Sequence, residues 1–244
     1  MPRYLLRIQY DGSGFFGWQR QNEGPTVQGC IEKGLSTILQ AKIEIHGSGR
    51  TDSGVHAEDQ AAHFDYEGEF PERLWPGRIN RVLPASIAID SVTRVDNDFH
   101  CRYDALYRQY RYQLTLSPKP LLRHQAWHAQ PEPDPALLQK CLDLISGIHS
   151  FENFAKATPD IKHMRCEILK TELVIPCEDQ IHIHIRANRF LRHMVRFLVG
   201  SMVQVATGRL VFEEFEAMLK DPKTPRKAIT APARGLILES VVYE

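Results

Sequence analysis

Residues 47–57 read Gly-Ser-Gly-Arg-Thr-Asp-Ser-Gly-Val-His-Ala and are the segment whose residue types best suit chemistry. Glycine lets the backbone turn sharply and lets a ligand approach closely. In an extended segment Arg50 and Asp52 would lie on the same side, and an adjacent arginine favours the ionised carboxylate. Such a carboxylate can act as a nucleophile or a base. A glycine-rich turn closed by a local salt bridge explains the same pattern, so the residue types alone leave both interpretations open.

Three other motifs lack the context that their chemistry needs. Residues 12–17 match the dinucleotide-binding pattern G-x-G-x-x-G, but the next helix is expected only after Thr26, too late for a Rossmann loop. His182 and His184 fall on one face of an expected strand, and two histidines alone make a weak metal site. A solvent-facing histidine pair opposite isoleucines is the favoured interpretation. No G-x-S-x-G elbow supports a serine hydrolase.

The composition is that of an ordinary soluble globular protein. The chain has 244 residues, of which 43% are hydrophobic and 25% charged, and its 30 basic and 30 acidic residues cancel. No run approaches the roughly 18 apolar residues of a membrane span, so none is expected. The five cysteines are odd in number and form no C-x-x-C. We therefore expect a reduced, cytoplasmic location and no zinc finger.

Basic residues are concentrated in two segments although the net charge is zero. Residues 181–212 contain five arginines and no acidic residue. In residues 99–128 the basic residues are accompanied by a single acidic residue, Asp104. Such segregation is the electrostatic footprint of a nucleic-acid-binding protein, although solvated surface charges would give the same pattern.

Hydrophobic periodicity predicts an α+β protein. The expected strands are residues 3–10, 42–46, 60–66, 87–95, 107–116, 165–175, 180–187 and 235–243. Helices are expected after Thr26, after Asp134-Pro135 up to Gly147, and over residues 190–206 and 211–220. This order predicts two ferredoxin-like or RRM-like domains, residues 1–104 and 105–244. Their antiparallel sheets would join side by side, with helices on one face and the active site in the cleft between the domains.

Several ordered motifs resemble those of the tRNA pseudouridine synthase A family. Residues 49–57 resemble its active-site signature, and the other matching blocks extend over nearly the whole chain. Cys101 stands where the family more often has alanine, and Pro76 interrupts a segment that is usually helical. The other blocks are residues 10–21, 26–28, 99–102, 107–112, 147–151, 190–196 and 231–236.

The resemblance implies that the protein isomerises uridine to pseudouridine at positions 38 to 40 of the tRNA anticodon arm, without cofactor or metal. Asp52 would be the nucleophile, attacking the sugar or the pyrimidine ring. Arg50 would displace the flipped base and Tyr110 would lie against it. Arg196 would pair with Asp52, and Leu236 would supply an apolar wall.

The expected helix over 190–206 would place Arg189, Arg192, His193 and Arg196 on one face, since they are spaced 0, 3, 4 and 7 residues apart. Arg189 and Arg192 would then contact phosphates. The resemblance further implies a homodimer that binds tRNA in a basic cleft. The alternatives are a non-catalytic RNA-binding protein of the same fold, which has no need of Asp52, and a metal-dependent hydrolase that uses the pair of histidines on the expected strand over 180–187.

Overall fold

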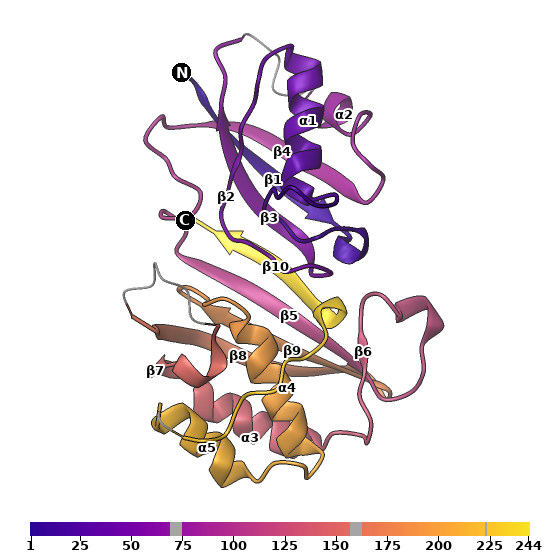
Figure 1. Cartoon of the computed structure of the whole chain (residues 1–244), viewed down its shortest axis with the longest axis vertical. Helices are drawn as coiled ribbons and strands as arrows, with labels where there is room; N and C mark the ends of the chain where they lie inside the picture. The colour runs from indigo at the N-terminus through magenta and orange to yellow at the C-terminus, as the bar shows by residue number, and fades with distance from the viewer. Residues whose placement is uncertain (69–74, 157–162, 223) are drawn as a thin grey trace. The chain divides into compact units, whose positions relative to one another are not determined.

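The computed structural model describes residues 1–68, 75–156, 163–222 and 224–244. The chain forms two compact units, which we call unit 1 (Met1–Leu106 with Ile237–Glu244) and unit 2 (Tyr107–Leu236). Each unit has a mostly antiparallel sheet with helices, so the predicted α+β class is confirmed (Figure 1). Among the described residues, no helix has the length and apolar character needed to cross a membrane.

Unit 1 is built on the strand order β4-β1-β3-β10. The strands β1 (Arg3–Tyr10), β3 (His56–Asp65) and β4 (Ile87–Val95) pair antiparallel, whereas β10 (Leu236–Val242) pairs parallel to β3. The sequence assigned residues 237–244 to the second domain, but this segment returns to the sheet of unit 1. Apolar side chains of β1, including Leu6 and Ile8, are fully buried.

Two helices accompany this sheet. Thr26 caps α1 (Val27–Leu39) as predicted, since its side chain accepts a hydrogen bond from the Gly29 N–H. The short α2 (Trp75–Ile79) contains Pro76 in its first turn. Proline is tolerated there because the N–H groups of the first turn have no acceptor within the helix, so the missing N–H of proline breaks no helical hydrogen bond. Figure 1 shows both helices on the same side of the sheet.

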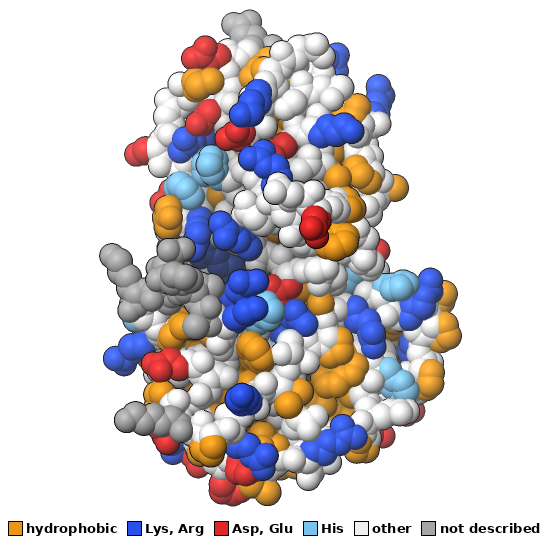
Figure 2. All heavy atoms as spheres, in the orientation of Figure 1, with side chains coloured by type: hydrophobic (Ala, Val, Ile, Leu, Met, Phe, Trp, Pro, Cys, Tyr) orange, Lys and Arg blue, Asp and Glu red, His pale blue; other side chains and the backbone are white. Residues whose placement is uncertain are grey.

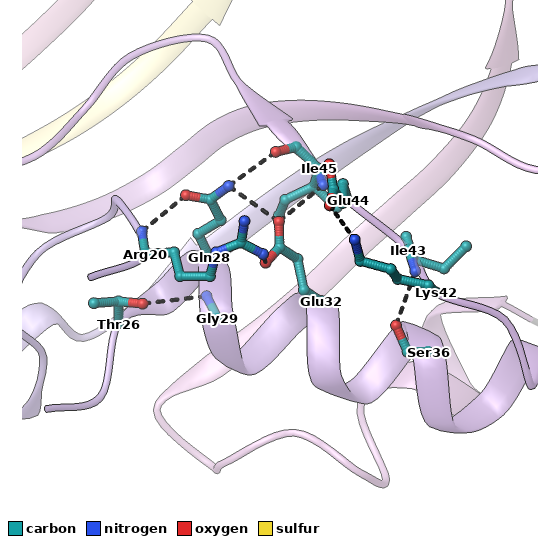
Figure 3. A network of polar contacts seen from close by, with 10 residues as sticks. All are labelled: Arg20, Thr26, Gln28, Gly29, Glu32, Ser36, Lys42, Ile43, Glu44 and Ile45. Atoms are coloured by element: carbon teal, nitrogen blue, oxygen red, sulfur yellow. Dashed lines mark hydrogen bonds and ion pairs between the residues drawn. The ribbon is translucent and has the colours of Figure 1, made fainter. Parts of the chain in front are cut away.

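The strand expected over 42–46 is reduced to β2 (His46–Gly47), which pairs with β3. The preceding residues bond to side chains of α1 instead of a neighbouring strand (Figure 3). The Ile43 N–H donates to Ser36 Oγ (3.0 Å), and the Ile45 N–H donates to Glu32 Oε1 (3.1 Å). The backbone donors of this segment therefore have helix side chains as partners, so the expected strand does not form before His46.

Unit 2 has the strand order β5-β9-β8-β7, and all three pairings are antiparallel. Its strands are β5 (Tyr107–Thr115), β6 (Trp127–His128), β7 (Gly147–Ser150), β8 (Arg165–Cys177) and β9 (Gln180–Ala187), with β6 parallel to β5. The helices α3 (Pro135–Ile145), α4 (Met194–Ala206) and α5 (Phe212–Lys220) lie on one face of this sheet (Figure 1). Asp134 caps α3 as predicted, with Pro135 at its first position.

The helix expected over 190–206 begins only at Met194, and this overturns one inference from the sequence. His193 precedes the helix with a left-handed backbone (φ 64°), and the Arg192 carbonyl accepts a hydrogen bond from the Lys156 N–H (3.0 Å). Residues 188–193 are therefore a connection tied to neighbouring segments. Arg189 and Arg192 do not share a helical face with Arg196, contrary to the prediction.

Candidate active site

The loop that contains Asp52 connects β2 to β3 in unit 1. Its first residues are fixed by β3, because the Ser48 N–H donates to the Ala61 carbonyl (2.8 Å) and Gln60 Nε2 donates to the Gly49 carbonyl (3.0 Å). A turn follows, in which the Val55 N–H donates to the Asp52 carbonyl (3.1 Å). The backbone on both sides of Asp52 is thus held by hydrogen bonds.

A second loop, residues 11–18, lies directly against this turn. The Trp18 N–H donates to the Thr51 carbonyl (3.1 Å), and Ser53 Oγ donates to the Phe15 carbonyl (3.0 Å). A Cβ atom at Gly17, whose φ is +92°, would lie 2.8 Å from the Thr51 oxygen, and one at Gly12 would collide with the Val55 carbonyl. These glycines allow backbone to approach backbone. The glycine pattern of residues 12–17 therefore serves loop packing and not dinucleotide binding.

Thr51 anchors the centre of the loop in the core. Its side chain is 7% exposed, and its Oγ1 is hydrogen-bonded to the buried Tyr10 hydroxyl at 2.8 Å. Burial raises the pKa of Tyr10 to about 12, so this hydroxyl stays neutral at physiological pH. With Thr51 turned inward, the residues on either side reach the surface: Arg50 is exposed and Asp52 is half-buried.

The helix α1 supports loop 11–25 and the segment that leads to β2 through two buried side chains, Gln28 and Glu32 (Figure 3). The amide of Gln28 accepts from the Arg20 N–H (2.9 Å) and donates to the Ile45 carbonyl (3.0 Å) and to Glu32 Oε1 (3.0 Å). Glu32 also accepts from Arg20 Nη1 (2.8 Å). Gln28 and Glu32 are 8% and 6% exposed, so loop 11–25 and the segment leading to β2 are tied to a common buried polar pair.

In unit 2, Tyr110 lies on β5, and its ring meets the ring of Phe190 edge-on, with the centroids 5.0 Å apart and the planes at 88°. Tyr110 and Arg108 are half-buried, but Tyr112 on the same face is completely buried. Burial raises the pKa of the Tyr112 hydroxyl, which donates to the Pro232 carbonyl at 2.7 Å. That face of β5 therefore changes from surface to core along the strand.

Arg196 lies in the first turn of α4 and holds the segment that precedes β10. Its Nε donates to the Ala231 carbonyl (2.9 Å), while the Ala231 N–H donates to the Arg196 carbonyl (2.9 Å). Leu236, at the end of this segment, is buried with 5% exposure. Within unit 2, the structure thus links Arg196 and the 231–236 motif through one side-chain and one backbone hydrogen bond.

The two arginines predicted to bind phosphate lie in the connection before α4. Arg189 is half-buried and its Nη2 donates to the His163 carbonyl (3.3 Å), whereas Arg192 is exposed. Figure 2 shows Lys and Arg side chains over the visible face of both units, with acidic side chains among them.

The histidine pair on β9 is less exposed than the solvent-facing pair favoured from the sequence, since His182 Nε2 is buried. His182 and His184 are half-buried with ring centroids 6.3 Å apart, while Ile181, Ile183 and Ile185 are at most 1% exposed. Within the described part of the chain, the pair is not joined by a third residue that could complete a metal site.

The sequence did not single out the side chains that position the loop. The Tyr10 hydroxyl and the Gln60 amide hold it by side-chain hydrogen bonds, and Trp18 holds it by its backbone N–H. The signal available was that residues 10–21 and 49–57 both resemble motifs of one family, so both segments were candidates for one site.

Comparisons with known proteins find similar sequences along almost the whole chain. A family model described as tRNA pseudouridine synthase matches residues 7–104 and 143–244. A tRNA pseudouridine synthase A from Picosynechococcus is 40% identical over 99% of this chain and 89% of its own length. Proteins of that name from Chlorobaculum tepidum (38% identical; 98% of this chain, 96% of the relative) and Moorella thermoacetica (36%; the full length of both) are also similar.

The matched ranges include the Asp52 loop, the α1 support, α4 with Arg196 and the 231–236 segment. The chain therefore belongs to the tRNA pseudouridine synthase family.

Proposed function

We propose that this protein isomerises uridine to pseudouridine at positions 38 to 40 of the tRNA anticodon arm, with Asp52 as the nucleophile. The observation that carries the proposal is the Asp52 turn: a half-buried carboxylate, beside an exposed arginine, on a loop held by a second loop and by β3. A carboxylate held in this way is preorganised for attack.

The reaction needs no oxidant or reductant, since it conserves all atoms of the nucleotide. The bond between N1 of uracil and C1′ of the sugar breaks, the base turns, and C5 bonds to C1′. The proton on C5 is lost and N1 gains one. Asp52 assists either by attacking C1′ or by adding to the pyrimidine ring, and in both routes its ionised form is the reactive one.

The target base must leave the helical stack before it can react, which costs a few kcal/mol. Arg50 is exposed and only two residues from Asp52, so it can enter the stem and fill the space that the base vacates. Tyr110 offers a ring against which the uracil can stack, a contact that contributes about 1–3 kcal/mol in single-strand binding. The edge-on packing of Phe190 restricts the orientation of that ring.

The roles of Arg196 and Leu236 follow from the resemblance and from their surroundings in unit 2. Arg196 would pair with Asp52, and its Nε bond to Ala231 would fix the direction of the guanidinium. Leu236 would provide an apolar wall for the base. The active site proposed here draws on both units, and the protein would work as a cytoplasmic homodimer. Arg189 and Arg192 would contact tRNA phosphates.

The experiment is to map pseudouridine in tRNA incubated with the protein and with Asp52→Asn. We expect modification at positions 38 to 40 with the unchanged protein and none with the variant. The affinity of Asp52→Asn for tRNA should stay within about threefold, because removing a negative charge does not weaken attraction to phosphate. Normal pseudouridine formation by Asp52→Asn would overturn the role of Asp52. Tight tRNA binding without modification by either protein would favour the non-catalytic alternative.

A further inference from the structure

A cluster of imidazoles and one thiol lies in unit 1, at a place that the proposed reaction does not use. His63 is on β3, and His100 and Cys101 belong to the turn after β4. One potential metal-ligating atom from each of these three residues lies within 4.8 Å of the other two. Among the described residues, this is the one group of its kind.

The fold holds this cluster through contacts that are independent of any ligand. His46 pairs in register with His63, and their rings stack with centroids 5.1 Å apart. The His100 ring meets that of His63 edge-on at 4.8 Å. Cys101 is fully buried, and its carbonyl accepts a hydrogen bond from the Tyr243 hydroxyl (2.7 Å), so the turn is tied to the C-terminal segment.

We propose that His63, His100 and Cys101 bind a divalent transition-metal ion of the Zn²⁺ class. Two imidazole nitrogens and a thiolate sulfur form the donor set that Zn²⁺ prefers. His46 lies beside the three but outside their spacing, so water supplies the fourth ligand. This site goes beyond the isomerisation proposed above and does not take part in it.

The three ligand atoms lie only slightly farther apart than the ligand atoms around a bound zinc ion do. Zinc–nitrogen distances of about 2.0–2.1 Å and zinc–sulfur distances of about 2.3 Å put tetrahedral ligand atoms roughly 3.3–3.7 Å apart. The three atoms must therefore approach one another by up to about 1.1–1.5 Å. His100 is only half-buried, so rotation of its side chain can supply this movement and also give the ion a path of entry.

Binding exchanges weak hydrogen bonds for metal bonds. In the absence of an ion, Cys101 Sγ donates to the His46 carbonyl (2.9 Å), and the Cys101 N–H donates to His63 Nδ1 (3.4 Å). The ion replaces the thiol proton, which passes to solvent, so that one sulfur–metal bond forms as one S–H bond breaks. The nearby cation Arg3 does not oppose this, because Asp65 accepts two hydrogen bonds from its guanidinium (2.8 and 2.9 Å).

An ion at this position would stabilise unit 1. It would join β3 to the turn after β4, and β3 already pairs with β2, which leads directly into the Asp52 loop. The expected role is structural, since Asp52 and Arg50 themselves are not ligands.

The test is a titration of the chelator-treated full chain with Co²⁺, which reports tetrahedral thiolate coordination by its visible and near-ultraviolet absorption. We expect one Co²⁺ per chain with a thiolate charge-transfer band, displaced by Zn²⁺. Cys101→Ala should abolish that band, and His100→Ala should weaken binding at least tenfold. The matched controls Cys177→Ala and His184→Ala, which remove a thiol and an imidazole of unit 2, should bind as the unchanged chain does.

A second measurement does not depend on spectroscopy. Zn²⁺ should raise the Tm of the unchanged chain and leave that of Cys101→Ala unaffected, and both apo proteins should show the same circular dichroism. The proposal is overturned by a chain that binds no Co²⁺, or by binding that persists unchanged in Cys101→Ala. Loss of the thiolate band in Cys177→Ala but not in Cys101→Ala would overturn it equally.

Discussion

The two units hold their candidate residues by different means. In unit 1, Arg50 and Asp52 lie two residues apart on one loop, and close contact between two backbones fixes that loop. In unit 2, Tyr110 and Arg196 come from a strand and a helix that are far apart in the chain, and the 231–235 segment bonds to both elements. Position in unit 1 therefore depends on glycines that let two backbones meet as well as on side-chain hydrogen bonds, whereas in unit 2 the contacts that link the elements are side-chain hydrogen bonds to backbone carbonyls.

The largest effect is expected from Gly12→Ala. The new methyl group would collide with the Val55 carbonyl, so loop 11–18 and the Asp52 turn would have to separate. Overpacking of this kind typically costs about 1–3 kcal/mol or more, and displacement of Asp52 should lower turnover at least a hundredfold. Urea unfolding and pseudouridine assays measure the two effects.

The matched control for this prediction is Gly14→Ala, two residues along the same loop. A Cβ atom there meets nothing within 4 Å, so stability and turnover should stay close to those of the unchanged chain. Equal losses in Gly12→Ala and Gly14→Ala would show that general loop flexibility, and not the close approach of the loops, positions Asp52.

The second prediction compares one arginine from each unit. Arg50→Ala should slow the reaction most where the target uridine is paired and least where it is already unstacked, because flipping is then cheap. Arg196→Lys keeps the charge but loses the planar fork, so it should slow the reaction about equally on both substrates. Single-turnover rates on intact tRNA and on an anticodon arm with the target pair disrupted distinguish the roles.

If disruption of the pair rescues Arg196→Lys as fully as Arg50→Ala, then the two arginines share one function and the assignment to separate roles is wrong. Arg209→Lys is a suitable control from the same basic segment, since Arg209 is exposed and its Nη2 bonds to the Gln130 carbonyl.

How well the sequence predicted each region depended on how local its interactions are. The strand bounds 3–10, 87–95 and 180–187 agree with the structure, because alternating apolar residues there face one core. The caps Thr26 and Asp134 were also predictable, since each bonds to an N–H two or three residues away. The Asp52 loop could be recognised for the same reason: its chemistry lies within a few consecutive residues.

Features decided by distant contacts could not be predicted in this way. The apolar residues around 190 suggested a helix, but Phe190 packs on Tyr110 and Arg192 bonds to Lys156 instead. The last strand pairs with β3, which precedes it by about 180 residues, and no local pattern encodes that partner. The cluster of His63, His100 and Cys101 was missed because a contact between β3 and the turn after β4, and not sequence spacing, brings it together.

A third, smaller effect concerns the support that α1 gives to unit 1. Glu32→Gln replaces one carboxylate oxygen of Glu32 by an NH₂ group, which donates instead of accepting. The oxygen that is lost is either the one that accepts from Gln28 and the Ile45 N–H or the one that accepts from Arg20. Leaving one of these buried donors without an acceptor should cost about 1–3 kcal/mol. Glu44→Gln removes only the exposed pair with Lys42 and should destabilise the protein less than Glu32→Gln does. Equal destabilisation of the two variants in urea would contradict a specific role of the buried pair.

The smallest effect lies in unit 2, where Asp179 in the turn between β8 and β9 accepts hydrogen bonds from Lys119, Cys177 and Ser117. These interactions, with that of Lys119 largest, lower the pKa of Asp179 to about 2. An unfolded aspartate titrates near 3.9. The folded carboxylate therefore contributes stability above about pH 4 and loses it as the pH falls towards 2. Asp179→Asn should lower the Tm slightly at pH 7, and the difference from the unchanged chain should shrink steadily between pH 4 and pH 2. A difference in Tm that stays constant over this range would mean that Asp179 acts through the geometry of its turn and not through its charge.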